Sequence, residues 1–312
     1  NSDFSRTDMS HATIVESNLS RGRFNGANLE SVDFTDSRLS MAVFFEANFK
    51  NANLNRAQVK GAKLAGGTFE NTSLPRADIT GADLTGAKFL NSNLSRAKLN
   101  GAILRRTDLK GSDLSEADLS IADLTGASLI EVKLIGANME RIKLNQAKLP
   151  GAQLCGAKIN KAKLAQVDLS KADLSGANLT GADLTESNLQ DCDLSRANLT
   201  EAILQKANMK STFLIGANLQ KADLTEVNLE EANIAGTKLG KANCQKANMK
   251  KVDLQRSDLE HADFTQADLT EANLTGCKLV DAYFKNANLT GADLSLADTT
   301  DTDFSNAKGY NS

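Results

Sequence analysis

The chain places an apolar residue at every fifth position from Phe4 to Phe304, with Thr299 as the one exception and without one insertion or deletion. This series has 61 positions, of which 40 are Leu, 10 Phe, 4 Met and 4 Ile. A helix turns about 100° per residue, so a period of five would spread these side chains around it. In a strand, an odd period would send successive side chains to opposite faces. The chain must instead return to a common axis every five residues, which predicts a solenoid.

The other positions of the pentapeptide have roles of their own, and we call its large apolar residue the centre. Two residues before the centre, 38 of 61 residues are Ala, so a small and a large side chain can fill a narrow interior together. One residue before the centre, 38 of 61 are Asp or Asn, which bond nearby backbone N–H groups in turns. Two residues after it stand 17 of the 21 glycines, which indicates a corner with positive φ. Pro75 and Pro150 both come one residue after a centre, where the N–H must be dispensable.

The phenylalanines indicate how many pentapeptides make one turn. Nine of the ten central Phe residues form triplets with a spacing of 20 residues, and Phe34 is the exception. Aromatic rings pack well on one another in stacked layers, so four sides of five residues would place each triplet in one column. The triplets are Phe4, Phe24 and Phe44; Phe49, Phe69 and Phe89; and Phe264, Phe284 and Phe304.

The consensus A-[DN]-L-x-x, as in Ala172-Asp173-Leu174-Ser175-Gly176-Ala177-Asn178-Leu179, resembles the pentapeptide repeat family over essentially the whole chain. The resemblance implies an all-β fold, a right-handed quadrilateral β-helix, which agrees with the Phe spacing. We expect about 15 coils without internal loops, and a rise of ~4.8 Å per coil would give a rod of roughly 70 Å.

The unbroken register predicts a single domain over residues 1–308, followed by a C-terminal tail at 309–312. The repeat begins at the first residues and no capping segment is visible, so we expect missing flanks or end-to-end contacts through uncapped ends. The oligomeric state stays open. No apolar run approaches the ~20 residues of a membrane span, so we expect no membrane insertion.

The four cysteines favour a reducing compartment. Cys192 and Cys277 replace the small inward residue, Cys244 replaces a central Leu, and Cys155 alone is expected to be exposed. Cys192 and Cys277 are 85 residues apart, or about four coils and ~20 Å, too far for a disulfide. We therefore expect free thiols and a cytoplasmic protein, or one delivered into a host cytosol if it is an effector.

The residues of a catalytic or metal site are not assembled in this sequence. The two histidines, His11 and His261, are about 12 coils apart, and Cys and His do not occur at metal-ligand spacing. We expect no enzymatic activity and no cofactor. The net charge is −3, and no aromatic residues interleave the basic region from Lys206 to Arg256, so we do not expect nucleic acid binding.

Two kinds of outward residue break the repeat and are candidate partner contacts. Arg56, Arg76 and Arg96 stack at 20-residue spacing and would repel one another unless an anion or an acidic partner lies nearby. The alternative is a solvated stripe of splayed side chains with carboxylates such as Asp78 close by. Exposed apolar residues are the second kind, and they either form a partner surface or are scattered surface residues or local inward rotations. Our preferred contacts among them are Met41, Val43, Phe45, Phe213 and Ile215.

The leading hypothesis is a non-catalytic, rigid, rod-like scaffold or protein–protein interaction module, which could be part of a larger bacterial effector or regulator. An alternative comes from the resemblance to family members that protect DNA gyrase as mimics of duplex DNA. Those members resemble an acidic rod, whereas the charge here is nearly balanced and lysines interrupt the acidic columns. Ice binding would need continuous threonine rows, and the row that begins at Thr180 and Thr200 ends at Gln220.

Overall fold

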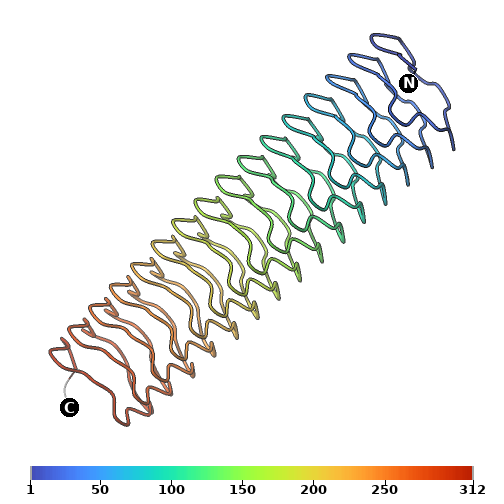
Figure 1. Ribbon diagram of the computed structural model, residues 1–312. Helices are drawn as coiled ribbons and strands as arrows, with labels where there is room; N and C mark the ends of the chain where they lie inside the picture. Colours follow the sequence, from blue (N-terminus) through green and yellow to red (C-terminus); the bar gives the residue numbers. More distant parts are fainter. Residues whose placement is uncertain (1, 311–312) are drawn as a thin grey trace. The chain divides into compact units, whose positions relative to one another are not determined.

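The computed structural model describes residues 2–310. Backbone contacts divide the chain into two compact units, Asn1–Lys158 (unit 1) and Ile159–Ser312 (unit 2). Within each unit the chain winds through stacked coils (Figure 1). Residues 2–310 contain no α-helix and no strand longer than a single bridge residue, and the same turn-and-bridge pattern recurs in every pentapeptide.

Two side chains of each pentapeptide fill the interior of the coil. Leu84 and Ala82, the centre and the small residue two before it, are both 0% exposed. Asp83 between them points outward and forms parallel bridges to Lys63 and Ile103 in the neighbouring coils. Because the pentapeptides between Phe24 and Leu289 repeat this arrangement, the core is a continuous apolar column in each unit.

A tight turn forms each corner of the coil. At most corners the amide of the residue three after the centre donates to the carbonyl of the centre, as Ala87 does to Leu84 at 2.9 Å. The residue two after the centre has positive φ at every corner from Arg6 to Asn306, whether or not it is glycine. Positive φ at the third residue alone is the signature of a type II turn, and this confirms the role predicted for the glycine position.

The Asp and Asn residues before each centre support these corners. Their side-chain oxygens accept from the amide two residues on, as Asp83 does from Thr85 at 3.0 Å and Asn178 from Thr180 at 3.1 Å. The backbone N–H of the residue after the centre donates only to such a side chain, so proline, which has no N–H, fits at this position. Two residues before Pro75 the chain accordingly has Ser73, and not an Asp or Asn.

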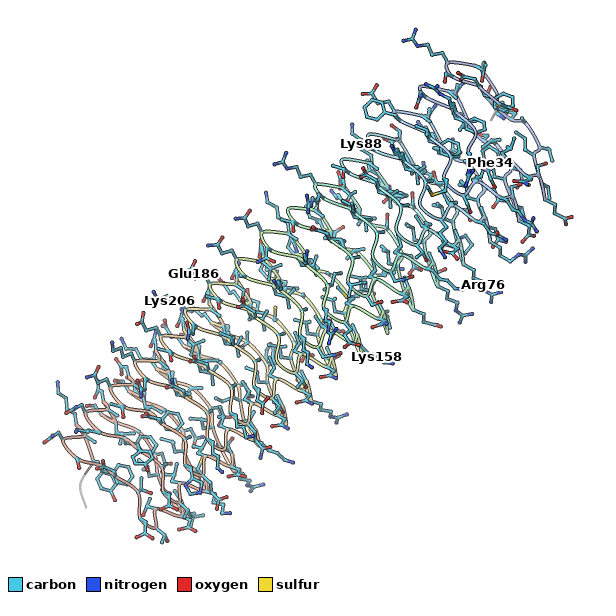
Figure 2. The ribbon with its side chains drawn as sticks, viewed as in Figure 1. Phe34, Arg76, Lys88, Lys158, Glu186 and Lys206 are labelled. Atoms are coloured by element: carbon cyan, nitrogen blue, oxygen red, sulfur yellow. The ribbon has the colours of Figure 1, made fainter. Side chains whose placement is uncertain are left out.

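One coil contains 20 residues, as the phenylalanines predicted. Parallel bridges join residues 20 apart throughout both units, from Asp3 to Arg23 onward. The four sides of each coil give the right-handed quadrilateral β-helix predicted from the sequence. In each Phe triplet the rings stack with centroids 4.4–5.2 Å apart. Phe34, outside these columns, is also fully buried and lies in the interior in Figure 2.

The last described residues fold back onto the core. Tyr310 stacks on Phe304 with the ring centroids 3.8 Å apart and so extends the aromatic column of unit 2. Gly309 has a φ of +75°, and an added Cβ there would lie 2.6 Å from the Cα of Thr290. Glycine is therefore required at this close approach. The expected tail at 309–312 thus begins with a contact to the last coil, and residues 311–312 lie outside the described part.

The cysteines lie as the sequence predicted. All four are free, Cys155 is exposed, and Cys192, Cys244 and Cys277 are buried. Burial raises the pKa of Cys192 to about 12 and that of Cys277 to about 11, and it raises the pKa of Cys244 as well. A thiol with a raised pKa forms little of the reactive thiolate at neutral pH.

We therefore expect that a thiol-exchange reagent applied to the folded protein near neutral pH modifies Cys155 alone. One equivalent of thiol should react before unfolding and all four after unfolding in guanidinium, counted by absorbance. The variant Cys155→Ser should leave no reactive thiol in the folded protein. Rapid reaction of a second cysteine would contradict the burial of the other three.

Candidate partner-binding surface

The Met41–Phe45 cluster, which we define as Met41, Val43 and Phe45, interrupts a polar surface in unit 1. Met41 is 58% and Phe45 50% exposed, whereas Val43 is half-buried between its bridge partners Arg23 and Lys63. Met41 stands at a corner with positive φ, a conformation that a large apolar residue rarely adopts. Neither packing nor turn geometry explains these exposed apolar side chains, which makes the cluster a candidate contact surface.

The arginine column is only partly neutralised. Arg56 donates two hydrogen bonds to the carboxylate of Asp36, in the coil before it, and Arg96 donates two to Glu116, in the coil after it. These hydrogen bonds hold the pKa of Asp36 and of Glu116 below their usual values. Within residues 2–310, Arg76 forms no ion pair.

A shallow hollow of about 420 Å³ surrounds Arg76, and Asn55, Pro75, Ser95 and Ser115 contribute to its lining. Arg76 projects outward at the edge of its coil, away from the interior occupied by Phe34 (Figure 2). The predicted carboxylate neighbour Asp78 is not the residue that neutralises the column. The outer arginines lean away toward Asp36 and Glu116, which leaves Arg76 as the cation available to an acidic group.

The sequence shows Glu116 as the next residue in the arginine column, but Asp36 was not singled out, although its spacing contained the signal. Asp36 precedes Arg56 by 20 residues and Glu116 follows Arg96 by 20, so each pair shares a column. The same is true of Lys206 and Glu226, whose charged atoms lie 4.0 Å apart. Figure 2 shows Glu186 and Lys206 on adjacent coils of the same edge.

Phe213 and Ile215 form the second predicted apolar pair, in unit 2. They are 51% and 48% exposed. Phe213 bridges Asp193 and Asn233, so polar residues flank it along the column. The structure thus places this pair on the surface.

Other exposed apolar residues occur in both units, and Ile103 and Ile121 are two of those in unit 1. Ile103 and Ile121 are 38% and 57% exposed. The Cδ1 atom of Ile121 lies 3.7 Å from the position that a Cβ would take on Gly101. The Ile121 side chain therefore extends over the preceding coil, which also contains Ile103.

The surface charges of the two units differ in sign. Residues 1–158 carry 20 Lys and Arg against 17 Asp and Glu, a formal net charge of +3, and residues 159–312 carry 16 against 22, which gives −6. In unit 2, parallel bridges join Lys238, Asp258, Lys278 and Asp298 into a column of alternating charge. Lys278 nevertheless pairs with Glu260, which stands outside that column.

Residues that could support catalysis are sparse and exposed. His261 Nδ1 lies 3.6 Å from Asp281 Oδ2, and both side chains are nearly half exposed. Within residues 2–310, no three His, Cys, Asp or Glu side chains are grouped so that they could hold a metal ion. The same part of the chain has no helix with the length and apolarity that a membrane crossing requires.

Comparisons with known proteins agree on one family. A model of pentapeptide repeats matches eight successive segments that span residues 15–308. HetL, a pentapeptide repeat protein involved in heterocyst differentiation regulation in the cyanobacterium Nostoc sp. strain PCC 7120, is 32% identical over 77% of this chain and 90% of HetL, with a TM-score of 0.25. QnrB1, a plasmid-mediated fluoroquinolone resistance protein, is 19% identical over 74% of this chain and 91% of QnrB1, with a TM-score of 0.30. None of the curated proteins compared with the chain matches it.

Proposed function

The chain belongs to the pentapeptide repeat family, and we propose that it is a non-catalytic scaffold that binds another protein through exposed side chains on its faces. The observation that carries this proposal is the Met41–Phe45 cluster. Met41 and Phe45 are both at least half exposed, at corners where the repeat mostly places polar residues or glycine. Burying such a side chain against a partner contributes ~1.5–3 kcal/mol.

Arg76 supports the same proposal through electrostatics. Its outer neighbours are neutralised by carboxylates, so it can pair with an acidic side chain of a partner without losing an existing ion pair. An exposed pair of this kind contributes specificity and association rate more than affinity. Phe213 and Ile215 offer a further contact in unit 2.

Within this proposal the protein acts in the cytoplasm of a bacterium, or in a host cytosol if it belongs to a delivered effector. Its four free cysteines support a reducing compartment. The alternative function, mimicry of duplex DNA toward a type II topoisomerase, would need a continuous acidic surface. In unit 2 the column of Asp183, Asp223 and Asp263 is interrupted by Ile203 and Tyr283, and no observation on this chain favours the alternative.

An affinity pull-down from the source lysate tests the proposal. We expect the wild type to capture a protein that a Phe45→Glu/Phe213→Glu variant captures at least about tenfold less, because a buried carboxylate would oppose docking. The variant Lys171→Ala is the matched control for an exposed corner and should capture as the wild type does. Equal capture by all three forms would contradict the proposal, and recovery of topoisomerase subunits would favour the alternative.

A further inference from the structure

We propose that one face of unit 1 binds an acidic amphipathic helix of another protein, and that this helix lies across the coils. We call it the 43–123 face, and its outward residues are Val43, Lys63, Asp83, Ile103 and Asp123. These five residues are joined by successive parallel bridges. The inference rests on the proposed function and gives the partner a defined chemistry. Two observations support it: two groups of exposed apolar residues lean toward each other, and cationic residues surround them.

The two apolar groups stand at opposite ends of the face. The Met41–Phe45 cluster is at one end, and Ile103 with Ile121 is at the other. The Met41 sulfur lies 2.6 Å from the position of a Cβ on Gly61, one coil further on, whereas Ile121 reaches back over Gly101. Met41 and Ile121 therefore lean toward each other along the corner.

The two coils between these groups have glycine corners on both sides of the face, and the side chains of Met41 and Glu46 overlie those of the first coil. Gly61 and Gly81 occupy one edge and Gly66 and Gly86 the other. An added Cβ on Gly81 or Gly86 would meet no atom within 4 Å. Since most corners elsewhere carry long side chains at the same positive φ, glycine here is not required by turn geometry or by crowding at these two positions. A partner segment can thus cross the face at the coil of Gly81 and Gly86 without meeting a side chain at either of these two corner positions.

The charges around the face select an acidic partner. Arg21, Arg23, Lys60 and Lys63 surround the Met41–Phe45 cluster, and of these four only Arg23 forms an ion pair, with Asp3 at 3.8 Å. At the other end Arg105 is bound to Asp123, while Arg106 lines a hollow of about 440 Å³ with Thr85 and Thr125. The opposing carboxylates that remain are Glu46 and Asp83. Cations therefore exceed anions across the face, and carboxylates on the partner would be attracted.

The dimensions favour a helix over an extended segment. Val43 and Ile103 are three coils apart, which is about 14 Å at ~4.8 Å per coil. A helix with side chains is ~10–12 Å across and would contact both apolar groups, whereas a single strand would leave one of them exposed. The backbone groups of this face are already bonded to the neighbouring coils, as Ile103 N is to Ala82 O at 2.9 Å, so an added strand would find no free edge.

The probe is a display library of random peptides about 20 residues long, because isolated helices shorter than ~12–15 residues are only marginally stable. Binding peptides are selected separately on three proteins: the wild type, the Gly81→Gln/Gly86→Gln variant and the matched control Gly176→Gln. Glutamine already occupies the same kind of corner at Gln266, and Gly176 in unit 2 is equally uncrowded. Thermal unfolding checks that all three proteins are folded.

We expect the wild type and Gly176→Gln to enrich acidic peptides with apolar residues at helical spacing. Their affinity should fall at least about tenfold on Gly81→Gln/Gly86→Gln and on Ile121→Glu, and it should weaken as ionic strength rises. Enrichment of basic or uncharged peptides, equal binding to the double glutamine variant, or no enrichment would overturn the inference. None of these outcomes bears on the lysate capture that depends on Phe45 and Phe213, so the proposed function is tested separately.

Discussion

Insertion of one residue after Leu174 is expected to lower the free energy of unfolding by about 3.5–5 kcal/mol. The insertion lengthens the corner closed by Ala177 N to Leu174 O, and it displaces Gly176 from its bond to Ser195. Each lost hydrogen bond costs ~1 kcal/mol. It also pushes the next centre, Leu179, out of register, and exposing a buried Leu costs ~1.5–3 kcal/mol. Urea unfolding followed by circular dichroism measures the loss.

Two further variants isolate the cause. Lys171→Ala, at an exposed corner three residues before Leu174, should change stability by less than about 0.5 kcal/mol. A duplication of residues 175–194 adds one whole coil and preserves both the period of five and the period of 20, so it should be tolerated. A one-residue insertion that costs under about 1 kcal/mol, or a duplication as damaging as the insertion, would show that the register does not govern this fold.

Phe69→Ala is expected to lower the free energy of unfolding by about 3–5 kcal/mol, the range for a large aromatic side chain removed from a packed core. Phe69 is 1% exposed, and its ring stacks between those of Phe49 and Phe89 at centroid distances of 4.6 and 4.4 Å. Thermal or urea unfolding measures the change. Phe45→Ala is the matched control, because Phe45 is half exposed and its loss should cost under about 1 kcal/mol.

A second substitution shows whether the ring itself sets the packing. A Cβ added to Gly67 would lie 2.8 Å from the Phe69 ring, so Gly67→Ala should destabilise the wild type by about 1–3 kcal/mol. In the Phe69→Ala background the ring is absent and the added Cβ has more space, so the destabilisation caused by Gly67→Ala should be smaller. Equal costs in both backgrounds would mean that Phe69 does not determine the glycine at position 67.

The architecture could be predicted because each of its rules is local and recurs. The period of five fixes which side chains point inward, and the glycines mark the corners where positive φ is observed. The number of residues in a coil needed a longer-range signal, which the stacked Phe triplets supplied. Gly22 and Gly67 are explained locally as well, because each stands two residues before a Phe whose ring occupies the space that a Cβ would take.

The surface could be predicted only in part. The sequence shows which residues stack at 20-residue spacing in one column, but it does not determine which neighbour a long side chain contacts. Lys278 shares a column with Asp258 but pairs with Glu260. Arg105 crosses to Asp123 in the next coil, and Val43 is more shielded than its position indicated. The lean of Ile121 over Gly101 likewise depends on a rotamer and a neighbouring glycine, not on the repeat itself.

Site-specific photo-crosslinking in the source lysate tests the central claim, that the Met41–Phe45 cluster contacts a protein partner. A photoreactive phenylalanine analogue at position 45 keeps the aromatic shape, and the same analogue at the exposed Tyr283 in unit 2 is the matched control. Our account predicts one discrete cross-linked species from position 45 that is absent or much weaker from position 283. No cross-link at position 45, or the same set of species from both positions, would contradict it.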